Sequence, residues 1–370
     1  MSSLSLSKGA SPAGWFAARW ARLNGTDRIA GVDLARGLAV VGMFAAHLLT
    51  TAERWIWADP STWSAIVDGR SSILFATLAG VSIGLVTGGR SPYSGSRMGV
   101  ARGRLAVRAG MLWVLGILLI LTGVPVYVIL PAYGILFLLA LPFTSWDARS
   151  LLWAAAGTGF VMAFAQPVLN ELPVWFGPYG RELSAALGWN YPFTLWVAFV
   201  LAGLGLARAD VTALATQVRM TVVGAALAVI GYSLAEIPLS TDSLYLQTVW
   251  QATPHSSGLL ELVGSGGFAV SVIGACLLLC RVRMIRMLVL PLRATGSMPL
   301  TAYTAQLAAW ALVAFMILGD TGDLFGFRAL EPFWPLTLGI VAGCTVWALV
   351  VGRGPLEWLL DRVSRLVGPL

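Results

Sequence analysis

Apolar stretches of about 20 residues recur along the whole chain, separated by short segments that carry most charges and turn residues. A helix needs about 20 mostly apolar residues to cross the hydrocarbon core of a bilayer. The pattern therefore predicts an all-α polytopic membrane protein with about ten spans. The predicted spans are residues 30–51, 70–89, 104–123, 126–143, 151–167, 193–208, 219–237, 258–280, 298–318 and 333–352.

The composition supports a bilayer location. The 370 residues are 58% hydrophobic and only 11% charged, which leaves too little polar surface to cover a soluble globule. The first residues are small, polar and basic, without the apolar core of a signal peptide. We expect a basic cytoplasmic tail over 1–29, one membrane domain over 30–352 and a cytoplasmic amphipathic segment over 353–370.

The basic residues indicate the orientation in the membrane, because Lys and Arg collect in cytoplasmic loops. With the N-terminus inside, only four of the 24 Lys and Arg residues fall outside, namely Arg54, Arg70, Arg181 and Arg328. Both termini are therefore expected in the cytoplasm, with the protein integral to a bacterial cytoplasmic membrane. This topology explains the net charge of +7, so no nucleic-acid partner is expected.

Three predicted outer segments are longer than a turn and rich in Trp, Tyr, Pro and acids: 52–69, 168–192 and 238–257. Such aromatics are typical of the belt at a membrane interface, with lipids as neighbours. Taken together they also suit a carbohydrate or a lipid headgroup. Asp59, in the first of these segments, is a candidate contact for such an acceptor.

Two glycine motifs and the cysteines indicate helix packing. GVSIG (80–84) matches the nucleophile elbow of hydrolases, but a continuous transmembrane helix lacks the strand-to-helix turn that exposes the serine. Its glycines, and those of GSGG (264–267), are better explained as small residues between close helices. Cys276, Cys280 and Cys344 lie in apolar stretches without further Cys or His at ligand spacing, so we expect packing residues and no metal.

The first span carries ionisable residues at both ends, which are costly in a bilayer unless paired or used. Asp33 and Arg36 lie near its cytoplasmic end and His47 near its outer end. Fourteen residues of helix separate Asp33 from His47 by about 21 Å, so the two groups cannot touch. Asp33 and Arg36 either pair with each other or belong to an anion-binding mouth.

The two histidines, His47 and His255, are both expected on the outer side. Imidazole suits proton transfer near neutral pH, although a lone His is often a packing residue. Asp68 and Arg70 open the second span after a short loop, which brings them near His47. Asp68 is expected either to orient the imidazole or to interact with Arg70.

The ninth span is expected to be broken. PLRATGSMPLTAYTAQ begins with Arg293 and is interrupted at Gly296 and Pro299, and a broken helix at membrane depth usually lines a cavity. Tyr303 and Gln306 follow three residues apart and face one pocket. Tyr133, in LPAYGILF, is a candidate to join them from the fourth span.

Four segments, in this order, carry a family resemblance. They are DLARGLAVVGM followed by His47, DGRSSILFATLAGVS, LRATGSMPLTAYTAQ and the closing RGPLEWLLDR. Together they resemble the heparan-α-glucosaminide N-acetyltransferase superfamily of transmembrane acyltransferases, and within it the bacterial YeiB-like branch. The chain departs from the pattern in the first outer loop. It has no His between 48 and 69, where the resembling enzyme carries its catalytic His, and His47 stands where that enzyme has an asparagine.

The resemblance implies an enzyme that takes acetyl-CoA, or another acyl-CoA, from the cytoplasm and acylates a sugar or glycolipid on the other side. His47 would then be the general base, with Asp68 as its orienter and His255 as a further catalytic candidate. Arg70 or Tyr303 would stabilise the thioester oxyanion, and an acetyl-histidine intermediate is the alternative to direct attack. The donor-binding candidates are Arg36, Arg104, Arg108, Arg293, Tyr133 and Tyr303, and the acceptor-binding candidates are Arg70, Gln306 and Asp59.

Two other functions compete with the enzyme. A transporter or flippase for a small envelope precursor needs the same cavity and broken helix, but is expected to place charges near the bilayer midplane. A non-catalytic scaffold is expected to have featureless spans, unlike those that carry His47, Tyr303 and Gln306. The Gly- and Ala-rich spans would also permit a homodimer.

Overall fold

The computed structural model describes residues 12–25, 28–52, 55 and 58–369, and over these residues the chain is all helical, as predicted, with no strand. The α-helices are α1 Pro12–Asn24, α2 Ala30–Leu48, α3 Arg70–Val86, α4 Gly95–Ile120, α5 Leu130–Ala140, α6 Ala148–Asn170, α7 Gly180–Leu187, α8 Phe193–Arg208, α9 Leu214–Ala235, α10 Leu244–Val249, α11 Leu259–Leu279, α12 Arg283–Leu288, α13 Leu290–Gly296, α14 Pro299–Leu318, α15 Leu324–Ala329, α16 Phe333–Val350 and α17 Pro355–Ser364. Four short 3₁₀ helices, η1 Pro60–Ile66, η2 Leu141–Ser145, η3 Pro173–Trp175 and η4 Arg365–Val367, complete the chain.

Each of the ten predicted spans contains a helix. Among the described residues, eight helical segments are long and apolar enough to cross a membrane, and Leu130–Ser145 and Phe193–Arg208 are shorter apolar segments. The number of helices that cross the bilayer therefore stays a prediction. The largest boundary difference is in α4, which begins at Gly95 rather than at 104, because its arginine-rich first turns are helical as well.

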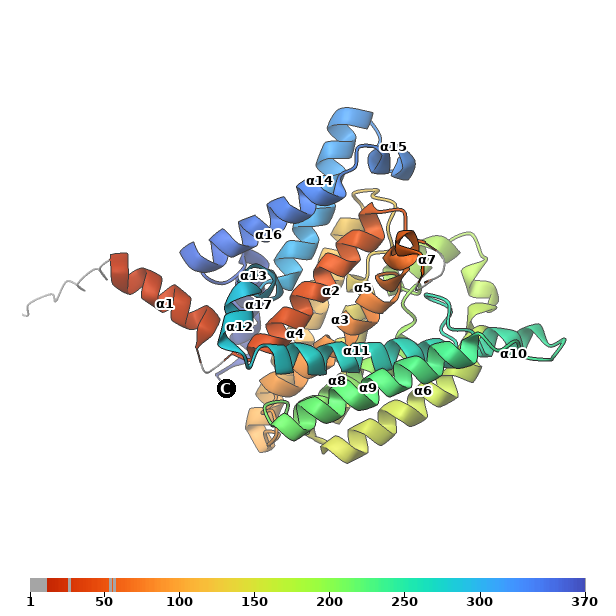
Figure 1. Cartoon of the computed structure of the whole chain (residues 1–370), viewed down its shortest axis with the longest axis horizontal. Coiled ribbons are helices and arrows are strands. Elements are labelled where there is room, and N and C mark those ends of the chain that lie inside the picture. Colours follow the sequence, from red (N-terminus) through yellow and green to blue (C-terminus); the bar gives the residue numbers. More distant parts are fainter. Residues whose placement is uncertain (1–11, 26–27, 53–54, 56–57, 370) are drawn as a thin grey trace, which may run out of the picture.

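Helices α2, α3 and α8 form the buried centre of the bundle (Figure 1). Helix α8 packs between α3 and α6, while α9 and α11 pack along each other beside them. A methyl group on Gly203 of α8 would lie 1.8 Å from the carbonyl oxygen of Thr77 in α3. On Gly80 it would lie 2.0 Å from the carbonyl oxygen of Val200. The helices therefore meet backbone to backbone, as predicted for GVSIG.

The GSGG segment has the same function between α11 and α9. A methyl group on Gly267 would lie 2.6 Å from the backbone nitrogen of Ala228, and one on Gly264 would meet the Tyr232 ring. The three cysteines are buried and form no disulfide, as expected for packing residues.

The predicted break before α14 is present, since α13 ends at Gly296 and α14 begins at Pro299. Helix α13 packs closely on α2, because a methyl group on Gly296 would lie 1.8 Å from the carbonyl oxygen of Asp33. The free N-terminus of α14 is capped from another helix. The Glu357 carboxylate of α17 accepts hydrogen bonds from the backbone of Leu300 (2.8 Å) and Thr301 (3.1 Å).

The described parts of the predicted terminal segments are helices that lie against the bundle. Helix α1 packs on α16, and α17 packs on α4 and α14. Residues 1–11, 26–27 and 370, together with Arg54 in the first outer segment, lie outside the described residues.

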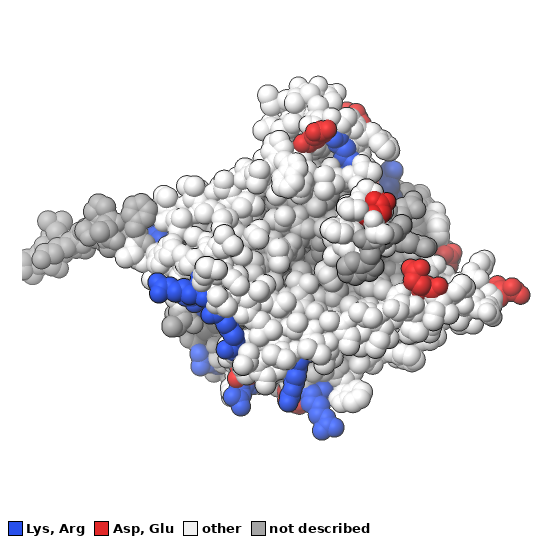
Figure 2. All heavy atoms as spheres, viewed as in Figure 1, with Lys and Arg blue, Asp and Glu red and all other residues white. Residues whose placement is uncertain are grey.

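Charged side chains gather at the two ends of the bundle. Figure 2 shows arginines around α12 and the neighbouring helix ends, acids near α10 and α15, and an uncharged surface between them. We call the first the basic end, defined by Arg22, Arg28, Arg108 and Arg353, and the other the acidic end, defined by Asp68, Asp242 and Glu331. This separation is the basis of the predicted cytoplasmic location of the basic end.

We predict that Gly203→Val destabilises the protein, because the new side chain would overlap the backbone of α3. Overpacking costs about 1–3 kcal/mol or more, so the thermal midpoint in detergent should fall. Gly157→Val is the matched control, since Gly157 of α6 has nothing within 4 Å of an added Cβ. Equal midpoints for the two variants would contradict the backbone contact.

Candidate functional site

A cavity of about 760 Å³ extends from the basic end into the bundle. It lies among α1, α2, α3, α4, α5, α14 and α17, and the broken α13–α14 segment contributes Ser297, Pro299 and Leu300 to its wall. Its opening is lined by arginines and its interior by apolar side chains. The lining arginines are Arg22, Arg28, Arg36, Arg108 and Arg353, and the apolar residues include Phe75, Leu78, Leu112, Leu130 and Phe137.

Carboxylates of the chain pair with most of these arginines. Asp33 accepts hydrogen bonds from Arg28 (2.9 Å) and Arg36 (3.3 Å), so the first of the two alternatives for Asp33 and Arg36, pairing with each other, is present, while Arg36 also lines the cavity. Asp361 of α17 forms ion pairs with Arg353 and, at 3.2 Å, with Arg108. The arginine cluster is thus only partly neutralised.

Arg22 differs from its neighbours, because its guanidinium has no hydrogen bond or salt bridge among the described residues. Burial and the positive charges of Arg353, Arg28 and Arg19 together lower the pKa of Arg22 to about 10, against the opposing effect of the Asp361 carboxylate. A positive charge held next to other positive charges is favourable when an anion occupies the site. The opening of the cavity therefore suits a multiply charged anion.

Tyr133 of α5 lies in the inner part of the cavity wall. Its side chain is 3% exposed, and its hydroxyl has no hydrogen-bond partner. The ring centroid lies 5.4 Å from that of Phe75. A buried hydroxyl without a partner costs free energy unless a ligand or water pairs with it.

Ser82, the central residue of GVSIG, lines the same cavity and accepts a hydrogen bond from Arg36 at 2.7 Å. The sequence analysis assigned this motif to packing alone and missed Ser82. It also missed Arg22, Arg28 and the cavity-lining residues Arg353, Glu357 and Asp361. The last three belong to RGPLEWLLDR, whose family resemblance was the available signal.

Two of the predicted donor-binding arginines do not line the cavity. Arg104 donates to the carbonyl oxygen of Gly368 near the C-terminus. Arg293 is fully buried and donates to Asn24 (3.0 Å) and to the carbonyl oxygen of Leu23 (2.8 Å). Arg104 thus holds the C-terminal segment and Arg293 holds the end of α1, so the predicted contact of these two arginines with the donor has no support from this cavity. Arg36, Arg108 and Tyr133 do line the cavity.

His47 lies at the other end of α2, with Gln306 and Tyr303 of α14. Its Nδ1 atom is 3.2 Å from the side-chain oxygen of Gln306, and its ring is 6.2 Å from that of Tyr303. With the amide oxygen of Gln306 facing the ring, Nδ1 is the donor of this hydrogen bond and Nε2 keeps its lone pair, because an amide oxygen only accepts. Arg328 donates to the backbone oxygen of His47 at 3.0 Å, which fixes the end of α2.

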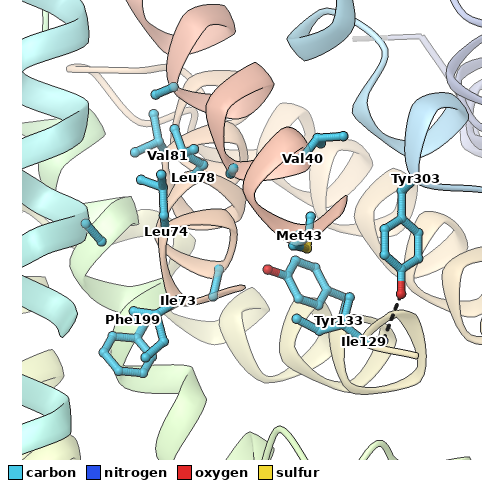
Figure 3. Close-up of a cluster of buried hydrophobic side chains, with 14 of the residues drawn as sticks. Val40, Met43, Ile73, Leu74, Leu78, Val81, Ile129, Tyr133, Phe199 and Tyr303 are labelled. Carbon is cyan, nitrogen blue, oxygen red and sulfur yellow. Dashed lines mark hydrogen bonds between the residues drawn. The ribbon is translucent and has the colours of Figure 1, made fainter. Parts of the chain in front are cut away.

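Tyr303 of α14 contacts both His47 and the start of α5. Its hydroxyl is 3.5 Å from the backbone nitrogen of Ile129, which donates to it, and Ile129 accepts the backbone hydrogen bond of Tyr133 (Figure 3). The predicted proximity of Tyr133, Tyr303 and Gln306 is therefore present, although only Tyr133 is among the residues that line the cavity.

Asp68 faces His255 rather than orienting His47. His255 Nε2 is 3.9 Å from the nearer Asp68 oxygen, and the ring packs edge-on at 5.4 Å from Tyr191. The hydrogen-bond partner of His47 is Gln306. Among the described residues no direct contact joins Asp68 to the His47 ring, so the orienting role of Asp68 has no support from a hydrogen bond.

Arg70 and Asp59 have other partners than those expected. Arg70 donates to the Tyr232 hydroxyl (2.7 Å) and to the carbonyl oxygen of Ala65 (2.6 Å), with its guanidinium over the Tyr232 ring. Asp59 is exposed and caps the 3₁₀ helix η1. Neither is placed at the cavity or beside His47, so a contact with a thioester in the cavity is not available to Arg70.

Within the described residues, no group of three or more His, Cys, Asp and Glu side chains could hold a metal ion. The arrangement provides an anion-binding opening, an apolar interior, a free hydroxyl and a histidine with a free lone pair. These are the elements of a transfer reaction from a phosphate-bearing donor to a nucleophile.

One family model matches the chain. It is described as "Heparan-alpha-glucosaminide N-acetyltransferase, catalytic" and covers residues 28–237, more than half of the sequence. The match includes α2 to α9 and therefore His47, Asp68 and Tyr133. It does not distinguish the YeiB-like branch, which stays an expectation. No curated protein matches the sequence.

We predict that His255 titrates below the ordinary histidine value of about 6.5. Burial away from water disfavours the charged imidazolium and lowers its pKa, and the Asp68 carboxylate partly opposes this effect. Asp68→Asn should therefore lower the pKa further. The measurement is an NMR titration of protein labelled with ¹⁵N-histidine, in which His47→Gln assigns the two signals. Asp59→Asn is the control, and a wild-type midpoint above the ordinary value would contradict the prediction.

Proposed function

The chain belongs to the heparan-α-glucosaminide N-acetyltransferase family, and we propose that it transfers an acetyl group from acetyl-CoA to a sugar or glycolipid acceptor. The donor binds in the cavity at the basic end, and the acceptor reaches His47 from the acidic end. The observation that carries the proposal is the cavity itself, with an arginine-lined opening, an apolar interior and the unpaired Tyr133 hydroxyl.

The charges of the cavity fit the phosphates of CoA. Guanidinium groups bind phosphate through paired hydrogen bonds, and Arg22 is available without breaking an ion pair. A volume of about 760 Å³ lies within the usual range of ligand sites, about 300–1,000 Å³. The apolar walls would surround the acyl-bearing arm, while the charged part stays among the arginines.

Tyr133 is the residue best placed to receive the acetyl carbonyl. As a buried donor without a partner, its hydroxyl gains a hydrogen bond when the thioester oxygen arrives, and a stronger one when that oxygen becomes negative. We prefer Tyr133 to Arg70 and Tyr303 in this role, because Tyr133 is the one of the three that lines the cavity and the Arg70 guanidinium already donates to Tyr232.

The reaction needs a base for the acceptor hydroxyl or amine. His47 Nε2 removes the proton, the acceptor atom attacks the thioester carbon, and the carbon–sulfur bond breaks. The departing CoA thiolate takes up the proton, so the products are the acetylated acceptor and CoA. In the acetyl-histidine alternative the same Nε2 attacks the thioester first and then passes the acetyl group to the acceptor.

The setting of this reaction follows from the charge pattern. The eight long apolar helices and the family make the protein an integral membrane protein. We propose that it lies in a bacterial cytoplasmic membrane with the basic end in the cytoplasm, where acetyl-CoA is made. The acceptor would then be a component of the cell envelope, and a homodimer stays a prediction.

We predict that acetyl-CoA binds the purified protein and that Arg22→Gln weakens binding about tenfold or more, since a hydrogen bond to a charged group contributes about 1.5–3 kcal/mol. Isothermal calorimetry in detergent measures this. Arg90→Gln is the control, because Arg90 is exposed and does not line the cavity. Absence of binding at millimolar acetyl-CoA to folded protein would reject the proposal and favour a transporter.

We predict that Tyr133→Phe lowers the rate of acetyl transfer by about 100-fold, the usual effect of losing one oxyanion donor. Folding stability should be unchanged or higher, because the lost hydroxyl has no protein partner. Binding of free CoA, which lacks the acetyl carbonyl, should be unaffected. A variant that transfers acetyl groups at the wild-type rate would exclude Tyr133 from this role.

A further inference from the structure

The loop before α11 has an unusual backbone. His255 (φ 62°) and Ser257 (φ 58°) both adopt the left-handed backbone conformation, which residues other than glycine rarely occupy. Two such residues so close together require contacts that compensate the strain. The loop also carries the second of the chain's two histidines.

The compensating contacts come from one buried carboxylate. Glu261, in the first turn of α11, is 4% exposed and accepts three hydrogen bonds from the loop. The donors are the backbone nitrogens of His255 (2.7 Å) and Ser257 (2.7 Å) and the hydroxyl of Ser256 (3.2 Å). The Glu261 carboxylate thus holds the strained loop through three hydrogen bonds that it accepts.

The other side of the loop packs on the start of α3. A methyl group on Gly69 would lie 3.0 Å from Pro254 Cβ, and Gly69 itself has a φ of 65°. This turn places the neighbouring Asp68 on the same side as His255, 3.9 Å from its Nε2 atom. The loop before α11 and the start of α3 are therefore packed together, and Glu261 holds the loop in this position.

We propose that Glu261 is a positioning residue that holds His255 against Asp68 at the acidic end, so that the pair binds the acceptor. The role in acceptor binding rests on the proposed acetyl transfer, whereas the positioning of His255 does not. An imidazole and a carboxylate next to each other can accept and donate hydrogen bonds to the hydroxyl or amino group of a sugar. Tyr191, edge-on to the His255 ring, fixes the ring from the other side.

The first test uses ¹⁵N-histidine-labelled full-length protein in detergent and does not depend on activity. Glu261→Gln keeps the shape of the side chain but removes its charge and one acceptor, so the loop should relax. The His255 signals should then shift. Its titration midpoint should rise toward the ordinary value, because a relaxed loop exposes the ring to water and burial is the larger effect on its pKa. The His47 signals should stay unchanged.

Two further variants make the result interpretable. Glu171→Gln is the same substitution at an exposed position at the end of α6 and should move neither signal. Ser256→Ala removes one of the three hydrogen bonds and should shift the His255 signals in the same direction by a smaller amount, which covers the case in which Glu261→Gln does not fold. Unchanged His255 signals in both loop variants would overturn the positioning role.

The second test measures acetyl transfer with glucosamine as the probe acceptor. Glu261→Gln should raise the KM for glucosamine at least tenfold while calorimetric binding of acetyl-CoA stays at the wild-type value. An unchanged KM together with shifted His255 signals would overturn the acceptor role and leave the positioning role standing. If wild-type protein fails to bind acetyl-CoA, the proposed function fails, and the labelled-histidine result still decides the positioning of His255.

Discussion

Helix α13 lies against α2 so closely that a methyl group on Gly296 would be 1.8 Å from the carbonyl oxygen of Asp33, and one on Gly37 would be 2.0 Å from that of Leu292. Only hydrogen atoms fit between the two backbones, so the short helix is held in place without long side chains. The chain then breaks at Ser297 and Met298, and α14 starts in a new direction from Pro299. The position of α14 therefore depends on this contact.

Both halves of the candidate site depend on the position of α14. At its start, Glu357 of α17 caps the free backbone nitrogens and brings α17 across the cavity opening, where Asp361 meets Arg108. Two turns further along, Gln306 reaches His47. One backbone contact thus aligns an anion-binding opening with a histidine at the other end of α2, about 21 Å of helix from Asp33.

The charges at the opening of the cavity are partly balanced within the chain itself. Asp33 and Asp361 pair with four of the cavity-lining arginines, which lowers the repulsion within the cluster. The pairing is incomplete, since Arg22 is left among positive neighbours and has its pKa lowered. A phosphate-bearing ligand would complete the neutralisation, which gives a reason for affinity at this end and for the apolar walls beyond it.

The sequence by itself determined the all-α membrane architecture, the helix in each predicted span, the glycine contacts and the break before α14, because these follow from hydropathy, residue size and proline. The expectation that Tyr303 and Gln306 share one face, with Tyr133 as a further candidate, came from helical spacing, whereas the contact of Gln306 and Tyr303 with His47 was not predicted. Only the tertiary structure decided the partners: Gln306 for His47, the C-terminal segment for Arg104, the end of α1 for Arg293, and Glu261 for the His255 loop. The physical reason is that spacing along a helix gives a residue's face and depth, whereas its hydrogen-bond partner depends on which other helix packs against that face.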